Sequence, residues 1–473
     1  MQHQTPHRST LSLSIGVGLL SAALYYYMAY EQVRYDFVTL FTSYTALFFS
    51  CYYLLKYARL TTVNVLLLGL VFRLIFILAT PSLSEDVYRF LWDGRLLAEG
   101  INPYLYIPNQ LFDQDSFFLS KEMMSIFDQM TDLSKQHFSN YPPVNQCFFW
   151  LSAVLGGKSI LGSIIVLRLI IILSEMGIFF IGIKLLQQLN MNMLNIGWFF
   201  LNPFIIIEFT GNLHFETVMI FFILLSLFLL VRGHWVWSAV VMGIAVSVKL
   251  IPLMLLPIFF QYFIKRNHSN PSLNFWKLML YYSVVILTFM LSFSPFISQE
   301  LLQNYSTTIG LWFQNFEFNA SIYYVVRWVG FQATGYNIIA SAGRVLPVIT
   351  VGIILLLTFF RKNTPLQQLI TGMLFAVNTY FLFSTTVHPW YIATPLVLGI
   401  FTRYTFPVVW SFVVMLSYSA YAGSFFQENA LLIAVEYVVL IVYMLYEIFR
   451  RKNPLNLSSS LCSTVQPIRK SRE

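Results

Sequence analysis

The sequence predicts an all-α, polytopic membrane protein: a bundle of about 12–14 transmembrane helices with a long first outer loop. Hydrophobic residues make up 58% of the 473 positions and charged residues only 10%, and the mean hydropathy is +0.69. Apolar runs of about 17–24 residues recur along the chain, and each could cross roughly 30 Å of hydrocarbon. A soluble domain of this length does not need so much apolar surface.

The charged residues that do occur indicate the topology. The chain has 28 basic and 20 acidic residues, a net charge of +8. The basic residues cluster in short loops between apolar runs, as the positive-inside rule expects. This pattern predicts that the protein contacts membrane lipids, and it argues against nucleic-acid binding. The three cysteines lie far apart and form no metal-ligand pattern, so no disulfide framework is expected.

The first three spans are expected at 10–30, 37–55 and 60–80. Lys56 and Arg59 place the second connection, and therefore the N-terminus, in the cytoplasm. Residues 81–143 then form the long extracytoplasmic loop. The segment 144–157 is expected to dip into the membrane or lie along it, because a full crossing would turn Lys265 and Arg266 outward.

The later spans continue the same alternation. Residues 1–452 are expected to form one membrane domain, and the polar segment 453–473 a disordered cytoplasmic tail. The spans are expected at 160–184, 194–210, 215–231, 235–250, 251–264, 275–296, 342–360, 366–386, 390–402, 405–422 and 430–449.

A short helix in the outer loop carries the densest charge of the chain. Ser82 and Glu85 fit a capping box, and Gly100 suits a left-handed stop. Asp86, Arg89 and Asp93 then share one helix face. Glu85 has a structural explanation as a cap, and Arg89 with Asp93 as an ion pair. Asp86 has no such structural explanation. A charged side chain beside a bilayer costs free energy, so we expect Asp86 to have a function.

Other polar clusters fall on the same outer side in this topology. The topology is assigned from the basic residues in the loops alone, so the position of these clusters is an independent observation. Each has a structural alternative: an interfacial aromatic anchor, a satisfied loop histidine or a snorkelling lysine. Their convergence with Asp86 favours a shared site. The residues are Asn102, Tyr141, Asn212, His214, Glu216, Lys249, His388, Trp390 and Tyr391.

This set of side chains suits transfer of a group from a lipid-linked phosphate. A carboxylate can take the proton of an acceptor hydroxyl; Asp86 is the first candidate and Glu85 the second. Lys249, Arg89 and Arg95 can stabilise the negative charge that develops on a leaving phosphate. Amide and aromatic groups can hold a polyol, with Asp93 among the candidate substrate-binding residues.

The order of the motifs resembles the GT-C superfamily of mannosyltransferases that use polyprenyl-phosphate mannose, including bacterial enzymes and the enzyme that adds the first mannose to glycosylphosphatidylinositol. The resemblance covers residues 60–400. One departure is that Glu85 and Asp86 are adjacent, where eukaryotic relatives have Asp-x-Asp. The motifs are Asp86-Val87-Tyr88, Asp93-Gly94-Arg95, Gly100-Ile101-Asn102-Pro103-Tyr104, Tyr141-Pro142-Pro143, Leu201-Asn202-Pro203, Gly211-Asn212 and Val248-Lys249-Leu250-Ile251-Pro252.

The resemblance implies an inverting glycosyltransferase in the bacterial inner membrane. It implies a polyprenyl-phosphate hexose, mannose above all, as donor, a lipid or glycan as acceptor, and Asp86 as the acid in the first outer loop. No cofactor is expected, no metal site is assigned, and a metal requirement and any protein partner are left open. A secondary transporter and another lipid-processing membrane enzyme are the alternatives. A transporter is expected to place its ionisable groups near the bilayer midplane, often between inverted repeats.

Overall fold

The computed structural model describes residues 7–113, 120–265, 271–314, 316–423 and 425–450. The all-α prediction is confirmed, since the described residues form helices and a single isolated β-bridge between Phe318 and Thr386. The predicted tail at 453–473 lies outside the described residues. Among the described residues, seven helices are long and apolar enough to cross a membrane, and an eighth span arises if the bent pair Met193–Phe200 and Pro203–Gly211 counts as one.

The N-terminal helices are α1 (His7–Tyr30), α2 (Phe37–Tyr57) and α3 (Thr62–Ile75). The region that the sequence predicts to face outward, called the outer region below, follows with α4 (Asp86–Ala98), α5 (Pro108–Asp113), α6 (Lys121–Asp128), α7 (Asp132–Lys135) and α8 (Pro143–Gly156). The next helices are α9 (Ile160–Gln188), η1 (Met193–Ile196), α10 (Gly197–Phe200), α11 (Pro203–Ile205), η2 (Ile206–Gly211), α12 (Glu216–Val231) and α13 (Trp235–Val248).

The C-terminal half begins with η3 (Ile251–Ile258), α14 (Phe259–Lys265), α15 (Pro271–Ser292) and η4 (Ser294–Phe296). It continues with α16 (Leu301–Gln314), α17 (Ile322–Thr334), α18 (Ile339–Phe359) and α19 (Leu366–Phe383). The last helices are η5 (Pro389–Ile392), α20 (Ala393–Ile400), α21 (Phe406–Val413), η6 (Val414–Tyr421) and α22 (Ala430–Arg450). Six shorter apolar helices accompany the long ones, so the count of 12–14 spans stays a prediction.

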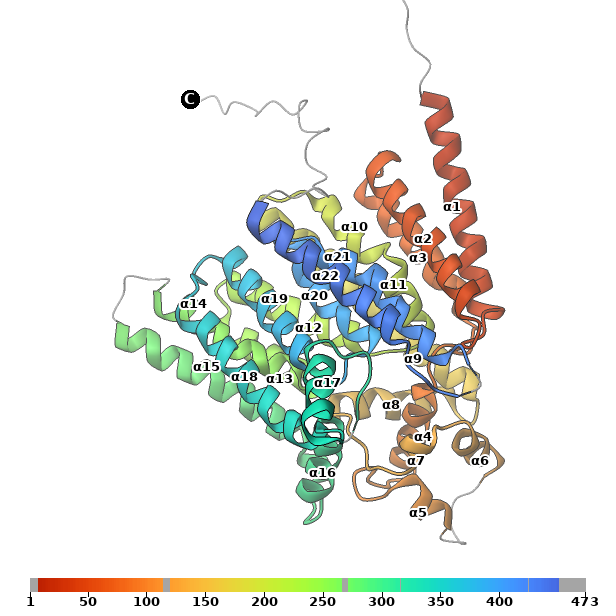
Figure 1. Cartoon of the computed structure of the whole chain (residues 1–473), viewed down its shortest axis with the longest axis vertical. Coiled ribbons are helices and arrows are strands. Elements are labelled where there is room, and N and C mark those ends of the chain that lie inside the picture. The colour runs from red at the N-terminus through yellow and green to blue at the C-terminus, as the bar shows by residue number, and fades with distance from the viewer. Residues whose placement is uncertain (1–6, 114–119, 266–270, 315, 424, 451–473) are drawn as a thin grey trace, which may run out of the picture.

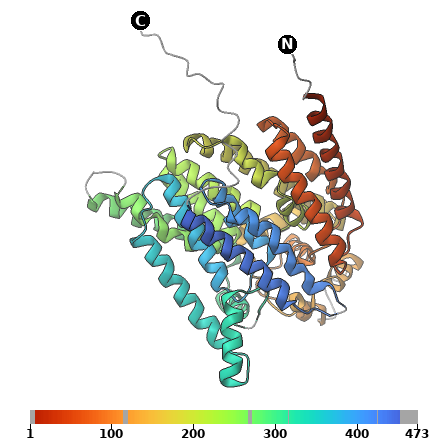
Figure 2. The ribbon, with the colours of Figure 1, turned by 45° about the horizontal axis from the view of Figure 1, so that its top comes forward.

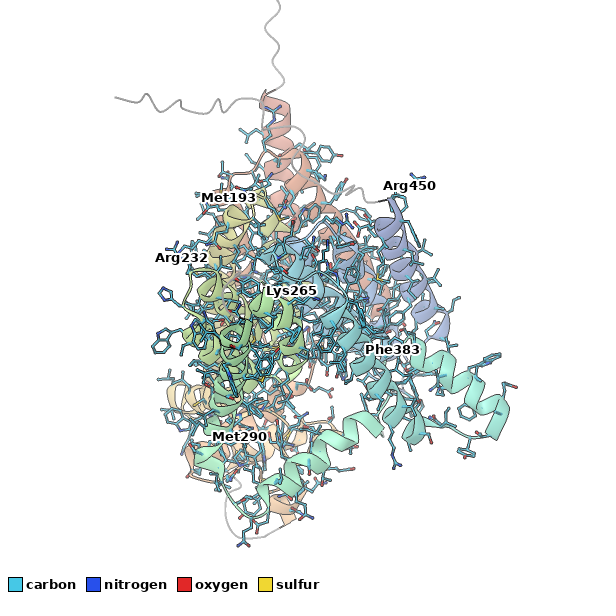
Figure 3. The ribbon with its side chains drawn as sticks, turned by 90° about the vertical axis from the view of Figure 1, so that its left-hand side faces the viewer. Met193, Arg232, Lys265, Met290, Phe383 and Arg450 are labelled. Carbon is cyan, nitrogen blue, oxygen red and sulfur yellow. The ribbon has the colours of Figure 1, made fainter. Side chains whose placement is uncertain are left out.

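The beginning of α1 and the end of α22 lie at one end of the bundle, and helices α4 to α8 lie at the other (Figures 1 and 2). Figure 3 places Arg232, Lys265 and Arg450 above Phe383 and Met290. These three basic residues lie at the end away from α4–α8, where the expected topology puts the cytoplasm.

One ion pair lies deep inside the bundle. Arg73 of α3 and Glu175 of α9 are both fully buried, and Nε of Arg73 donates to Oε2 of Glu175 at 2.6 Å. Nη1 of Arg73 donates further to the carbonyls of Gly69 and Phe200. A buried charge without such partners would strongly destabilise the fold, so this pair fixes α3 against α9.

Helix α4 is polar in sequence and yet buried along most of its length, from Val87 to Leu96. The predicted capping box is wrong. The helix begins at Asp86, so Glu85 and not Ser82 is its N-cap residue, and Glu85 makes no capping hydrogen bond. The backbone N–H of Asp86 donates to Ser84 Oγ instead. The stop is confirmed: Gly100 has φ +76° in the left-handed region that favours glycine.

Helix α8, the segment predicted to dip, packs against α4 and α9. Phe90 of α4 stacks on Phe149 of α8 with ring centroids 4.7 Å apart. The approach is close because Gly94 has no side chain: a Cβ there would lie 2.3 Å from the carbonyl oxygen of Phe149.

Gly94→Ala should therefore destabilise the protein by about 1–3 kcal/mol, the usual cost of overpacking. The measurement is thermal unfolding of the purified protein in detergent. Gly310→Ala is the matched control, since nothing lies within 4 Å of its added Cβ in α16. Equal melting temperatures for the two variants would contradict the close α4–α8 contact.

The topology gives a second prediction. Gln129 is exposed after α6, and Gln188 is exposed at the other end of the bundle, where α9 ends. In a background that lacks Cys51, Cys147 and Cys462, Gln129→Cys should react with a membrane-impermeant maleimide on intact cells. Gln188→Cys should react only after permeabilisation. The reverse pattern would place the α4–α8 end in the cytoplasm.

Candidate active site

A cavity of about 490 Å³ opens at the α4–α8 end of the bundle. This volume is within the range of small-molecule sites. The beginning of α4 and the segment 131–142 form its polar wall, whereas Leu250, Ile251, Leu253 and Met254, together with Ile309, form an apolar wall. The predicted site residues that line it are Glu85, Asp86, Arg89, Tyr141, Lys249, His388, Trp390 and Tyr391.

Asp86 is the first residue of α4 and presents its carboxylate to this cavity, with 41% of the side chain exposed there. Within the described part of the chain, the carboxylate accepts no hydrogen bond, and Nδ1 of His214 lies 4.0 Å from Oδ2. Protein surrounds the group on its other sides. That burial raises the pKa of Asp86, although the positive charges of Lys249 and Arg34 partly offset the effect.

Lys249 follows the last residue of α13, where the backbone becomes extended before η3. Its ammonium group forms an ion pair with Glu216, the first residue of α12. The side chain is 19% exposed and also lines the cavity, with Nζ 5.7 Å from the centre of the Tyr391 ring. Glu216 is fully buried and does not line the cavity, so its part is to hold Lys249.

Arg34 also lines the cavity, and the sequence prediction missed it. It lies between α1 and α2, with its guanidinium carbon 3.5 Å from the centre of the Tyr421 ring and Nη1 3.8 Å from Glu85. A signal was available: by the predicted topology this connection faces outward, where the positive-inside rule makes basic residues unusual.

Arg89 lines the cavity, but its charge is already engaged. Nε donates to Asp93 at 2.8 Å, and Nη1 donates to the carbonyls of Ser134 and His137. The ion-pair alternative for Arg89 and Asp93 is thereby confirmed. Asp93 is fully buried and also accepts from Ser139 at 2.5 Å, so the pair holds the segment 131–141 against α4.

Two predicted residues lie away from the cavity. Arg95 pairs with Glu122 of α6 at 2.6 Å and donates to Ser163 of α9. Asn102 donates to the carbonyl of Phe296 and accepts from the backbone N–H of Tyr104. Both side chains hold the outer region to the bundle.

The remaining predicted residues, His214 and Asn212, lie next to the cavity and contact residues that line it or flank it. Trp390 stacks between two histidines, with ring centroids 3.7 Å from His214 and 4.5 Å from His388. Burial and the nearby positive charge of Lys249 lower the pKa of His388 to about 3, so this ring is neutral at pH 7. Asn212 accepts from the backbone N–H of Leu83 at 3.2 Å, and this hydrogen bond joins the end of η2 to the segment before α4.

The described residues contain no group of three or more histidine, cysteine or acidic side chains that could hold a metal ion. The charged side chains that the cavity presents include two carboxylates, Asp86 and Glu85, beside two cations, Lys249 and Arg34.

Comparison with known proteins identifies the family. Residues 9–265 match the family described as alpha-(1->6)-mannopyranosyltransferase, N-terminal domain. The alpha-(1->6)-mannopyranosyltransferase A of Corynebacterium glutamicum is 22% identical over 362 residues, which cover 69% of this chain and 70% of the relative. The protein of the same name from Mycobacterium tuberculosis is 20% identical over 344 residues, 68% of this chain but only 61% of the relative. Because the family match spans more than half of the sequence, this chain belongs to the alpha-(1->6)-mannopyranosyltransferase family of membrane glycosyltransferases.

Proposed function

We propose that this protein transfers mannose from polyprenyl-phosphate mannose to a hydroxyl of a lipid or glycan acceptor, at the extracytoplasmic face of a bacterial inner membrane. The observation that carries the proposal is the accessible carboxylate of Asp86, which faces a cavity with Lys249 and Arg34 on its rim. Family membership supports the sugar. The position of Arg232, Lys265 and Arg450, at the end of the bundle away from α4–α8, supports the face.

The reaction exchanges one bond at the anomeric carbon and moves one proton. The acceptor oxygen attacks the anomeric carbon of mannose, and its proton passes to Asp86, which acts as the general base. The bond between that carbon and the phosphate oxygen breaks, and its electron pair leaves with the polyprenyl phosphate. Lys249 and Arg34 stabilise the charge that develops on the phosphate.

The two walls of the cavity suit two substrates. The apolar side chains of η3 and Ile309 fit the first isoprene units of the donor, because burying them there removes apolar surface from water. Ser134, Asn140 and Tyr141 on the polar wall fit the hydroxyls of an acceptor. The Arg89–Asp93 pair positions that wall without binding phosphate itself.

The names of the relatives specify an α-(1→6) linkage. We propose the same product here. Attack from the side opposite the phosphate inverts the anomeric carbon, so an α-linked product requires a β-linked donor. The acceptor group is then a primary hydroxyl at carbon 6 of a mannose.

The test is a transfer assay with the purified protein in vesicles and radiolabelled polyprenyl-phosphate mannose. The expected product is an extended acceptor that an α-mannosidase shortens again. Recovery of the unchanged donor on the opposite side of the vesicle would favour a transporter. Release of free mannose would favour another lipid-processing enzyme.

Asp86→Asn keeps the shape of the side chain and removes the proton acceptor. We expect kcat to fall by about 10²–10⁴-fold, the usual contribution of a general base, with unchanged expression. Asp132→Asn is the matched control, because its side chain is 92% exposed on α7. Turnover of Asp86→Asn within a few-fold of the parent would refute the assignment.

The raised pKa of Asp86 gives a pH dependence with a definite sign. The base acts when it is ionised, so kcat falls as the pH drops through the folded-state pKa, which lies above the ordinary value of about 3.9. Lys249→Ala removes a charge that lowers this pKa, and the acid limb should move to higher pH while donor KM rises. Lys249→Arg should reverse both effects in part, because it keeps the charge.

Lys158→Ala is the control for these lysine variants, since Lys158 is exposed between α8 and α9. An acid limb at the same pH in Lys249→Ala, Lys249→Arg and the parent would contradict electrostatic coupling of Lys249 to Asp86.

A further inference from the structure

A short non-helical segment before α17, residues 316–319, lies beside the cavity and is called the strap below. Phe316 of the strap lines the cavity, and Phe318 is buried. The backbone N–H of Phe318 donates to the carbonyl of Thr385 at 3.1 Å, and its carbonyl accepts from the N–H of Val387 at 2.8 Å. The strap is therefore paired with the segment that comes just before η5.

The ring of Phe318 contacts two side chains of the cavity wall. Its centroid lies 5.1 Å from that of His388 and 6.2 Å from that of Tyr421, and both of these residues line the cavity. His388 stacks in turn on Trp390. Tyr421 holds the guanidinium of Arg34 over its ring, 3.5 Å from the ring centre. One buried ring thus supports both the aromatic stack at η5 and the group that carries Arg34.

The next residue of the strap, Asn319, is hydrogen-bonded to the C-terminal part of the chain. Its backbone N–H donates to Oε1 of Glu428 at 2.6 Å, and its carbonyl accepts from the hydroxyl of Tyr437 at 2.6 Å. Its Nδ2 donates to Oε1 of Glu436 at 3.3 Å. A carboxyl group accepts through its carbonyl oxygen in either protonation state, so this anchor does not depend on the charge of Glu436. Two of the three partners, Glu436 and Tyr437, belong to α22.

The backbone of Asn319 has φ +45°, in the left-handed region. Asparagine adopts this region more readily than most residues other than glycine. In this conformation the N–H and the carbonyl of one residue both bond to side chains from the C-terminal part of the chain. Such a conformation persists where the surrounding contacts enforce it, so the strap has one defined position.

The two cations of the cavity are held in different ways. Lys249 has a fully buried carboxylate, Glu216, as its partner. Arg34 rests on the ring of Tyr421, and its carboxylate neighbour Glu85 is 3.8 Å away and 47% exposed. Contact with the face of a ring uses none of the guanidinium N–H donors, so they can bind phosphate oxygens.

We propose that Phe318 and Asn319 are positioning residues for the donor phosphate, because the strap holds the ring of Tyr421 in the place where it presents Arg34 to the cavity. The inference rests on the proposed function for the role of Arg34 as a phosphate-binding group. A long arginine side chain loses conformational freedom when it binds an anion, and a ring that already holds the guanidinium reduces this cost.

The kinetic test is Phe318→Leu, which keeps an apolar side chain and removes the supporting ring. The KM for the donor should rise about twofold to tenfold, a partial loss of a cation–π contact, and the KM for the acceptor should not change. Phe259→Leu is the matched control, because Phe259 is equally buried but packs against Tyr281 in another part of the bundle. Phe318→Leu with the donor KM of the parent would overturn the proposal.

Arg34→Ala shows whether the strap acts through Arg34. In that background, Phe318→Leu should change the donor KM no further, because the group that the strap positions is already absent. Increases in donor KM that multiply in the double variant would overturn the proposal.

The two features of Asn319 give a second pair of variants, which also serves if Phe318→Leu does not fold. Asn319→Gly removes the hydrogen bond to Glu436 but keeps the left-handed backbone accessible, whereas Asn319→Ala disfavours both. The donor KM should rise in both variants and more in Asn319→Ala. Thermal unfolding of each variant reports its fold. A donor KM in Asn319→Ala equal to that of the parent would contradict the anchoring role.

A binding measurement tests the same coupling without transfer. The probe is farnesyl phosphate, a prenyl phosphate without a sugar, titrated calorimetrically into the purified protein in detergent. Its Kd should rise in Phe318→Leu by the same factor as the donor KM, and the two should be unaffected by Phe318→Leu in the Arg34→Ala background. A parent that binds no farnesyl phosphate, or equal Kd values in the parent and Phe318→Leu, would overturn the proposal. If the parent shows this coupling but transfers no mannose, the proposed function fails and the role of the strap stands.

Discussion

The structure depends on one constraint: a charge inside an apolar bundle needs a partner. Arg73 has Glu175, Arg89 has Asp93, Arg95 has Glu122, and Lys249 has Glu216. These pairs tie α3 to α9, hold α6 and the segment 131–141 against α4, and fix the lysine at the cavity. Asp86 differs, because its carboxylate faces the cavity without a hydrogen bond in the described part of the chain. The same constraint that stabilises the fold thus leaves one acid available for a substrate.

Several segments of irregular backbone lie around Asp86. The π-helical turn of η2, the left-handed Leu213, the extended Lys249 and the 3-10 segment η5 all lie beside the cavity. Non-helical backbone at membrane depth is tolerated where protein buries it or where it lines a cavity. The short helices that result place polar side chains from distant parts of the chain around one space. This arrangement explains why several of the apolar runs are too short for a simple crossing.

Features set by neighbours in the sequence could be predicted, and features set by distant contacts could not. Hydrophobic runs predicted the helices, and spacing predicted the Arg89–Asp93 pair and the stop at Gly100. The prediction of a cap at Ser82 is wrong because the helix begins only at Asp86, and the backbone N–H of Leu83 donates to Asn212, from a distant part of the chain. Arg95 and Asn102 resemble binding residues in sequence. In the structure, however, Arg95 pairs with Glu122, and Asn102 donates to the carbonyl of Phe296. Arg34 was missed because its stacking partner, Tyr421, lies near the other end of the chain.

The central claim is that the cavity beside Asp86 holds the phosphate and the anomeric carbon of the donor. The most direct measurement is an experimental structure of the protein with a non-hydrolysable phosphonate analogue of polyprenyl-phosphate mannose. The account predicts the phosphonate in contact with Lys249 and Arg34, the mannose facing Asp86, and the isoprene units against η3. A phosphonate bound at the end that carries the chain termini, or bound away from Asp86 and Lys249, would contradict it.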